Sequence, residues 1–585
     1  MNPPHRISRS VNVYRIPGAG GQTVRHQLEL RASSVAVCDS EQVSLNAPTS
    51  LGGRLFGSRS GIIGAVLLIG LSFLGSRLLG LARTSVIAEQ YGTSVELDAF
   101  WVAMRLPDLV FQLLAGATLA SAFIPVYARV LQNRGERSAW RLASIVLNWV
   151  LLGTIALSVA VFFAAEWIVP ALAPGLGEDS GVQDAITEDA IFLTRVLLLS
   201  PILFSISGML TGILHARRHF LLPAISPMLY NLAIILGALL LPEQLGVEAL
   251  VIGVVAGSGL HLMIQLPALS TALVRSGGGL GFHFNLGDPE AREVLRLMAP
   301  RTLGLAAAQI NLIVLTFFGS LVGDSSISAL NFAWLLLMFP VGLFGMSLAT
   351  AVFPSLAERA AAAGPSAVNA MVSQTLRFTL FLAIPASIGM LLLRDSIVAT
   401  LLEHGAFDAA ATDLVSDALL FYAIGVFAHA AIEIVSRGFY VLGDTRTPVA
   451  LAIASMLLNI ILCAALVGPM ELKGLALALS ISAIAEFVLL TLLLNSRLSR
   501  QLLSPAIWWS AARTIVATAI MGQLVWLLIE LLIGLDIASD SWITLLLCVS
   551  GGAVVYFLLS LIMRQEEAEL LILRVESVLS RAFRR

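Results

Sequence analysis

Ionisable side chains interrupt several long apolar runs of this sequence, and their positions indicate where chemistry is expected. Arg77 lies roughly 24 Å along the first run at 1.5 Å per residue, and Arg83 follows on an adjacent helical face. Asp98 and Arg105 lie on the next run and share a face. An ionised group inside a bilayer costs several kcal/mol unless it meets a partner or water, so each of these four side chains is a functional candidate.

These charges admit more than one interpretation. Arg83 either faces a cavity or extends toward the outer interface of the membrane. Asp98 and Arg105 either form an internal ion pair or flank an anionic substrate. Two or three arginines with almost no lysine favour an anionic cargo that carries phosphate, because guanidinium forks match phosphate oxygens.

A second set of ionisable residues lies further along the chain. His429 and Glu433 have i,i+4 spacing, and Glu486 lies within a later apolar run. We expect them to carry protons or a cation, with helix-to-helix hydrogen bonding as the alternative.

Motifs for enzymatic chemistry are missing from the sequence. The single lysine, Lys473, stands outside any G-x-x-x-x-G-K-[ST] motif, and the sequence has no H-E-x-x-H motif. We therefore expect a protein that is not an enzyme and holds no cofactor or metal. A membrane potential or an ion gradient would supply any energy that it needs.

The elements that position these charges are helices. The 585 residues are 58% hydrophobic and only 12% charged, with a mean hydropathy of +0.90. Apolar stretches follow one another with short polar breaks and without the alternation of a barrel strand. The sequence predicts an all-α polytopic membrane protein with about fourteen transmembrane helices.

The sequence also contains an internal duplication. GATLASAFIP at 116–125 resembles GMSLATAVFP at 345–354, and R-x-L-G-L-A precedes both copies. The copies lie six predicted helices apart, so they run in the same direction through the membrane. This predicts two parallel six-helix lobes around a central cavity, which is the architecture of an alternating-access carrier.

The predicted organisation divides the chain into five parts. They are a disordered cytoplasmic tail (1–60), the first lobe with helices 1–6 (61–275), the second lobe with helices 7–12 (290–496), helices 13–14 (505–563) and a cytoplasmic amphipathic tail (564–585). The loops alternate between acidic and basic, and this pattern predicts that both termini are cytoplasmic.

Three stretches carry a resemblance to a known family. SRLLGLARTSVIAEQYGTSVELDAFWVAMRLPDLVFQLLAGATLASAFIPVYARV is followed far downstream by LLEHGAFD (401–408) and RGFYVLGDTRTPV (437–449). Together they resemble the MurJ/MviN family of lipid II flippases, within the multidrug/oligosaccharidyl-lipid/polysaccharide exporter superfamily. The resemblance implies fourteen helices and a cargo of undecaprenyl-pyrophosphate-linked disaccharide-pentapeptide, moved from the inner to the outer leaflet for peptidoglycan synthesis.

The resemblance also implies site residues. The cavity arginines of the first helix fall on Arg77 and Arg83, the acid that opens the second helix falls on Asp98, and the basic residue before its Leu-Pro falls on Arg105. Some members hold a sodium ion in the second lobe, and one ligand matches Asn459. Cys463 stands where a carboxylate would be expected, which argues against sodium coupling in this chain.

This sequence departs from the family pattern at further positions. Phe111 and Gln112 stand where members have two arginines, and Gly116 lies within Ala-Gly-Ala where they have Ala-Glu-Gly-Ala. Trp334 and Leu335 replace the Asp-Arg that some members have on helix 8. These departures reduce the charge of the cavity and leave the identity of the cargo open.

The expected protein is therefore a lipid II flippase of the bacterial cytoplasmic membrane, acting as a monomer, with membrane lipids and cell-wall synthesis enzymes as candidate partners and no role for nucleic acid. Two alternatives are kept. One is a carrier of another lipid-linked oligosaccharide or small amphiphile, and the other is a scaffold that does not transport and recruits envelope enzymes.

Overall fold

The computed structural model describes residues 59–285, 287–498, 502–534 and 542–583. The chain divides into two compact units, Met1–Ala65 and Val66–Arg585. The side chains discussed below all belong to the second unit. Residues 1–58 of the predicted disordered tail lie outside the described residues.

Helices make up the described chain, which contains no strand. The α-helices are α2 (Arg59–Tyr91), α3 (Val95–Leu114), α4 (Ala117–Leu172), α5 (Gln183–Leu197), α6 (Leu199–Ala216), α7 (Leu221–Leu240), α8 (Glu248–Met263), α9 (Leu266–Ser276), α10 (Pro289–Ser320), α11 (Ser326–Pro340), α12 (Ser347–Leu392), α13 (Arg394–Leu402), α14 (Ala409–Val441), α15 (Arg446–Arg497), α16 (Pro505–Gly534), α17 (Trp542–Ile562) and α18 (Glu566–Phe583). A 3-10 turn, η1 (Glu243–Leu245), and a π-helix, η2 (Val341–Met346), complete the set.

The all-helical membrane fold is confirmed, whereas the count of fourteen transmembrane helices stays a prediction. Within the described residues, 10 helices are long and apolar enough to cross a membrane, or 11 if the bent pair Pro289–Ala299 and Gly304–Ser320 is one span. One of these stretches, Val95–Leu172, has 78 residues, although a crossing needs only about 20. Non-helical backbone at Gly135 in α4 and at Glu471 in α15 breaks two long helices internally.

Both copies of the repeated sequence begin at a helix irregularity. In the first copy, α3 ends at Leu114 and α4 begins after Gly116. In the second copy, the π-helix η2 joins α11 to α12 and includes Gly345. π-Helices are rare and occur frequently at functional sites. The two copies therefore have similar sequences but different local structures. The first begins at a gap between two α-helices, and the second begins within a π-helix.

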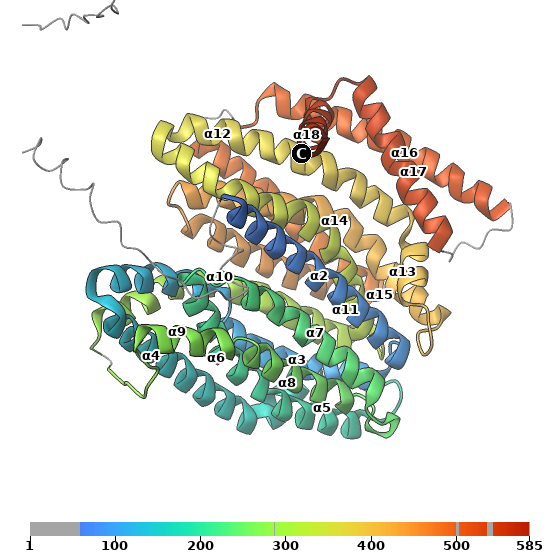
Figure 1. Ribbon diagram of the computed structural model, residues 1–585. Coiled ribbons are helices and arrows are strands. Elements are labelled where there is room, and N and C mark those ends of the chain that lie inside the picture. Colours follow the sequence, from blue (N-terminus) through green and yellow to red (C-terminus); the bar gives the residue numbers. More distant parts are fainter. Residues whose placement is uncertain (1–58, 286, 499–501, 535–541, 584–585) are drawn as a thin grey trace, which may run out of the picture. The chain divides into compact units, whose positions relative to one another are not determined.

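Helices that are distant in the sequence lie side by side in Figure 1. For description, α2 to α9 are called the first half and α10 to α15 the second half. Helix α10 packs against α3 and α4 of the first half and against α15 of the second. Helices α16 and α17 pack on each other, and α16 packs along α12.

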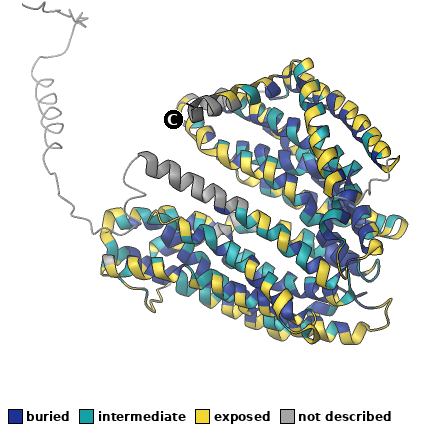
Figure 2. Cartoon of the chain, turned by 45° about the vertical axis from the view of Figure 1, so that its right-hand side comes forward, coloured by how far each residue is buried: buried dark blue, intermediate teal, exposed yellow. Residues whose placement is uncertain are grey.

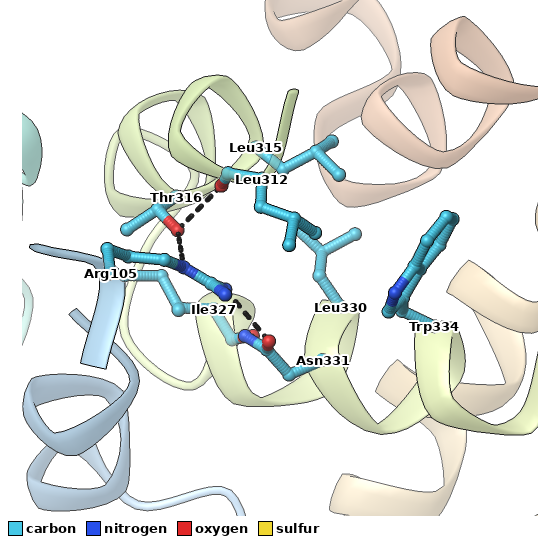
Figure 3. A pocket seen from close by; sticks show the side chains of 8 residues that line it. All are labelled: Arg105, Leu312, Leu315, Thr316, Ile327, Leu330, Asn331 and Trp334. Carbon is cyan, nitrogen blue, oxygen red and sulfur yellow. Dashed lines mark hydrogen bonds between the residues drawn. The ribbon is translucent and has the colours of Figure 1, made fainter. Parts of the chain in front are cut away.

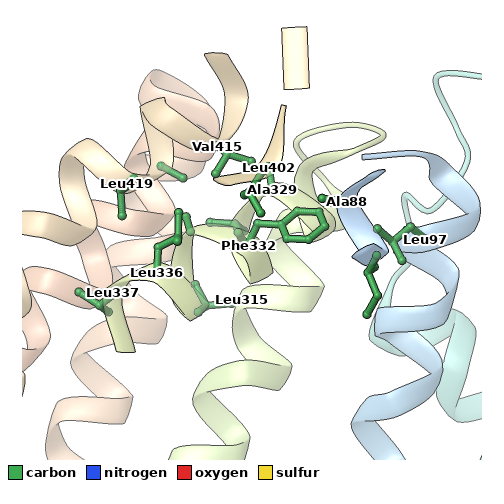
Figure 4. Packing of buried hydrophobic residues seen from close by; sticks show 14 of the residues in the cluster. Ala88, Leu97, Leu315, Ala329, Phe332, Leu336, Leu337, Leu402, Val415 and Leu419 are labelled. Atoms are coloured by element: carbon green, nitrogen blue, oxygen red, sulfur yellow. The ribbon is translucent and has the colours of Figure 1, made fainter. Parts of the chain in front are cut away.

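A buried apolar cluster connects the two halves (Figure 4). It includes Ala88 of α2, Leu97 of α3, Phe332 of α11 and Val415 of α14. The Phe332 ring also meets the Phe407 ring edge-on, with 5.6 Å between centroids. Close packing of these side chains stabilises the contact, because helix association inside a membrane depends on van der Waals packing.

The outer faces of the helices are apolar as well. Figure 2 shows exposed residues along the length of many helices, and on α16 they include Trp508 (63% exposed) and Leu531 (59% exposed). Exposed apolar side chains on this scale are unfavourable in water and are expected where a helix faces lipid.

The motif RGFYVLGDTRTPV forms the turn between α14 and α15. Gly443 adopts a left-handed conformation with φ 78°. Asp444 accepts hydrogen bonds from the Thr447 backbone N–H at 3.0 Å and the Thr447 hydroxyl at 2.7 Å. These bonds hold the pKa of the Asp444 carboxyl below its ordinary value. The motif therefore builds a charged cap at the start of α15.

The C-terminal helix α18 is fastened to α12 by one arginine. Arg377 of α12 pairs with Glu566 at 2.6 Å and with Glu567 at 2.7 Å. Glu567 is buried, and it also accepts a hydrogen bond from Ser510 of α16 at 2.9 Å. Arg377 thus neutralises a carboxylate that would otherwise be buried without a counter-ion.

We predict that Arg377→Gln loosens α18. The substitution leaves Glu567 as an uncompensated buried charge, which costs about 3 kcal/mol. Hydrogen–deuterium exchange along Glu566–Phe583 should therefore become faster in the purified protein. The control is Arg394→Gln, because Arg394 pairs with Asp395, whose side chain is 63% exposed, and such pairs contribute little. Equal exchange in the Arg377→Gln variant and the wild type would contradict the prediction.

Candidate functional site

Arg77 of α2 extends across the π-helix η2. Its side chain is exposed, and its Nη2 donates to Met346 Sδ at 3.8 Å. A Cβ atom added to Gly342 would lie 3.0 Å from Arg77 Nη1, so the guanidinium lies directly over that glycine. An exposed guanidinium on an apolar helix requires a polar environment or a polar ligand. Arg77 is therefore the predicted site residue that is best placed to bind an anion.

Arg83 is half-buried and linked to α7. Its Nη1 donates to Asn231 Oδ1 at 3.2 Å, and Asn231 Nδ2 donates to the Ser76 carbonyl at 3.5 Å. The Arg83 Nε is buried without a hydrogen-bond partner in the described part of the chain. Asp108 of α3 lies close enough to both Arg83 and Arg105 to interact with them electrostatically. Sequence reasoning missed Asp108, although its position three residues after Arg105 places it on a neighbouring face.

Asp98 contacts the second half of the chain and not Arg105. Asp98 is 1% exposed, and its Oδ1 accepts a hydrogen bond from the Ser328 backbone N–H at 2.6 Å. Ser328 lies in the first turn of α11, where backbone N–H groups have no partner within the helix. Asp98 thus caps α11 from the opposite half of the molecule, in the geometry that favours an anion at a helix N-terminus.

Arg105 also reaches into the second half (Figure 3). The side chain is 7% exposed, its Nε donates to Thr316 Oγ1 at 2.7 Å, and its Nη2 donates to Asn331 Oδ1 at 2.8 Å. The Asn331 amide nitrogen is held by the Ile327 carbonyl at 2.7 Å, which turns the amide oxygen toward Arg105. A small pocket of about 10 Å³, enough for one water molecule, adjoins these groups, and Trp334 is among its lining residues.

Loops at the same end of the bundle add further contacts between the halves. Asp324, before α11, accepts hydrogen bonds from the backbone N–H groups of Gly177 at 3.0 Å and Ser180 at 2.9 Å. The Ala406 N–H donates to the Glu89 carbonyl at 2.7 Å. We call this set of contacts, together with those of Asp98 and Arg105, the joined end.

Two glycines allow the backbones to meet at the joined end. Gly92 and Gly405 have φ values of 56° and 60°. A Cβ atom on Gly92 would collide with the Ala406 carbonyl, and one on Gly405 would collide with the Glu89 carbonyl. Gly405 belongs to the LLEHGAFD motif, so this motif forms the surface on which the end of α2 rests.

The ionisable residues of the second half do not act as one group. Glu433 pairs with Arg437 at 2.6 Å instead of with His429. His429 packs its ring edge-on against Trp334, with 5.7 Å between centroids, and its Nε2 is buried without a partner in the described chain. Glu486 lies close to Ser455, and it is near enough to Glu433 for the two carboxyl groups to interact electrostatically. His429 and Glu486 therefore remain the candidates for carrying a proton.

Asn459 belongs to a neutral hydrogen-bonded cluster. Its Nδ2 donates to Asn311 Oδ1 at 3.3 Å, and its Oδ1 accepts from Cys463 Sγ at 3.6 Å. Asn459 and Cys463 are both fully buried. Hard cations prefer oxygen ligands and carboxylates, whereas this cluster contains a thiol and two amides that already bond one another. These residues do not fit a sodium site. In the described ranges, no three His, Cys, Asp or Glu side chains gather as metal ligands.

The fold resembles the folds of solved membrane transporters. A solved lipid II flippase MurJ in an inward closed conformation superposes with a TM-score of 0.69 at 23% identity, covering 86% of this chain and 99% of that one. An inward-facing multidrug resistance MATE family transporter of the MOP superfamily superposes with a TM-score of 0.59 at 16% identity, covering 73% and 95% of the two chains.

Sequence comparison identifies the family within that class. The family model described as lipid II flippase MurJ matches residues 87–544. A lipid II flippase MurJ of Burkholderia cenocepacia is 33% identical over 427 residues, which are 72% of this chain and 81% of the relative. A probable lipid II flippase MurJ of Vibrio cholerae is 30% identical over 468 residues, covering 77% and 86%. This chain belongs to the MurJ family.

We predict that Asp98→Ala weakens the joined end. The substitution leaves the Ser328 N–H without an acceptor, at a cost of roughly 1–3 kcal/mol. Hydrogen exchange of the first turn of α11 should become roughly tenfold faster. Asp98→Asn is the matched control, because it keeps the side-chain oxygen that accepts the bond. Wild-type exchange in the Asp98→Ala variant would show that this contact is dispensable.

We also predict that the thermal stability of the wild type is the same in sodium and potassium chloride. Cys463→Asp adds a carboxylate to the Asn311 and Asn459 oxygens, and it should raise the melting temperature in sodium by about 2–4 °C. Cys463→Ser keeps the cluster neutral and should show no preference. A sodium-dependent melting temperature of the wild type would overturn the conclusion that its residues do not fit the ion.

Proposed function

We propose that this protein is a flippase that moves lipid II from the inner to the outer leaflet of the bacterial cytoplasmic membrane. The observation that carries the proposal is the exposed Arg77 guanidinium on an apolar helix, over the π-helix that follows α11. Membership of the MurJ family and the named activity of its relatives support the same cargo. The protein transports and does no covalent chemistry on its cargo.

Arg77 and Arg83 are the groups that bind the pyrophosphate in this proposal. Guanidinium groups bind phosphate oxygens through paired hydrogen bonds. Arg77 is exposed, and the buried Arg83 Nε has no hydrogen-bond partner among the described residues. Asn231, which already bonds Arg83, holds the second guanidinium in place. Arg105 and Asp98 are occupied by the second half, so they act on the conformation and not on the cargo in this state.

Alternating access follows from the joined end. Its contacts are hydrogen bonds to neutral groups, each worth about 0.5–1.5 kcal/mol or somewhat more for the charged partners. A cargo that binds better to the opposite state can therefore shift the equilibrium by a few kcal/mol and separate the halves. With both termini in the cytoplasm, as the loop charges predict, the joined end faces outward and cargo enters from the inner leaflet.

The proposal extends to the setting of the protein. It acts as a monomer with membrane lipids around it, and cell-wall synthesis enzymes supply and consume its cargo. The membrane potential or an ion gradient supplies energy. His429, whose Nε2 has no hydrogen-bond partner in the described residues, and Glu486 of α15 would carry protons.

A second cargo is considered because of one observation. Phe111, Gln112, Trp334 and Leu335 occupy positions at which the family resemblance leads us to expect charged residues. A cavity with fewer charges would also suit another lipid-linked oligosaccharide or a small amphiphile. A scaffold that recruits envelope enzymes without transport is the remaining alternative, and it would not depend on Arg77.

The test is growth of bacteria depleted of their own lipid II flippase, at matched membrane abundance of each variant. The wild type should restore growth, and Arg77→Ala should lower plating efficiency roughly tenfold or more, because a charge-assisted hydrogen bond contributes about 1.5–3 kcal/mol. The matched control is Arg134→Ala, which removes a 60% exposed arginine from a surface ion pair. A correctly inserted wild type that fails to restore growth would favour another cargo. Full activity of Arg77→Ala would favour the scaffold.

A further inference from the structure

Four aromatic rings from four helices meet in the first half of the molecule. Phe204 of α6 is at the centre of this aromatic cluster. Its centroid lies 5.3 Å from that of Phe111 (α3), 5.2 Å from that of Tyr230 (α7) and 5.2 Å from that of His261 (α8). All four side chains are half-buried. Part of the ring surface is therefore accessible to a ligand.

Polar groups border the same cluster. Arg83 and Asp108 lie close enough to Tyr230 to interact with it electrostatically. Asn231 follows Tyr230 in the chain and accepts the hydrogen bond from Arg83. Ionised groups avoid the lipid-facing surface of a membrane helix. The accessible side of the rings next to these charges is therefore an interior surface.

Hydrogen bonds around His261 and close packing around Tyr230 hold the aromatic cluster in place. Ser207 Oγ lies 2.6 Å from His261 Nδ1, Gln265 Nε2 donates to Ser207 Oγ at 2.7 Å, and Thr211 Oγ1 donates to Gln265 Oε1 at 3.0 Å. On the same helix as His261, Gly257 leaves room for the Tyr230 ring, because a Cβ atom there would lie 2.9 Å from Tyr230 Cδ2. Rings fixed in this way lose little entropy when they bind a ligand.

The combination of groups matches the chemistry of a sugar. Hydroxyl groups of a pyranose bond to carboxylate, amide and guanidinium groups. The C–H faces of the ring carry slight positive charge and pack on the negative face of an aromatic ring. A lipid tail would need the aromatic surface but not the charges, and a bare pyrophosphate would need Arg83 but not the rings.

We propose that Phe111, Phe204 and Tyr230, together with Arg83, Asp108 and Asn231, form a subsite for a sugar ring of the lipid-linked cargo. The inference rests on the proposed function and deepens it. Phe111 stands where the family resemblance leads us to expect arginine. In this chain an aromatic contact to the saccharide therefore replaces a charge contact, and this explains how a cavity with fewer arginines still holds a glycolipid.

The experiment compares two probes on the full chain in nanodiscs: lipid II, and undecaprenyl pyrophosphate, which has the same lipid and pyrophosphate but no sugar. The wild type should bind lipid II more tightly. Phe204→Leu and Phe111→Leu should each weaken lipid II by about three- to tenfold and leave undecaprenyl pyrophosphate within about twofold. The matched control is Phe163→Leu, which changes a phenylalanine that is 66% exposed on α4.

Each outcome decides one question. If the Phe204→Leu and Phe111→Leu variants weaken both probes equally, or neither, the saccharide subsite is wrong. Phe111 has one ring contact in the cluster, so its variant remains informative if Phe204→Leu lowers the melting temperature. If the wild type binds neither probe above the level of an unrelated phospholipid, the proposed function itself fails. Loss of sugar preference in both variants, with intact binding of undecaprenyl pyrophosphate, supports the subsite.

Discussion

An arginine inside a membrane protein must find hydrogen-bond acceptors, and the two that Arg105 meets among the described residues both lie across the interface between the halves. Thr316 and Asn331 supply neutral oxygens that solvate the guanidinium, and Asp108 lies near enough to interact with its charge. Asp98 provides an acid seven residues earlier on the same helix, and it too is satisfied by the opposite half. Separation of the halves would expose both charges at once. The arrangement of α3 against α10 and α11 therefore depends on these two side chains.

Neutral hydrogen-bond partners for Asp98 and Arg105 suit an interface between the halves that has to open. A buried ion pair between the halves would be costly to break, because each separated charge would lose its counter-ion. Hydrogen bonds to a hydroxyl, an amide and a backbone N–H are weaker, and water can replace each of them when the interface opens. The same end of the molecule combines these bonds with close backbone contact, which requires shape complementarity more than charge.

The sequence singled out individual charged residues but did not predict their partners. Charges within apolar runs indicated Asp98 and Arg105, and helical spacing correctly placed them on one face. Their acceptors, Thr316 and Asn331, are ordinary polar residues of membrane helices, so no pattern distinguished them. His429 and Glu433 were expected to carry protons or a cation, but the sequence did not indicate that Glu433 would pair with Arg437, which lies four residues further along the helix. The helices followed from hydropathy, whereas the π-helix at Val341–Met346 left no recognisable signal.

The contact between Glu89 and Ala406 is made by the main chain alone. Any residue other than proline offers the same N–H and carbonyl groups, so positions 89 and 406 are free to change without loss of this bond. Gly92 and Gly405 are not free, because their positive φ values and the carbonyls beside them leave no space for a side chain. The side chains at positions 89 and 406 can therefore change during evolution. The geometry of the contact is kept by Gly92 and Gly405, which have no side chain.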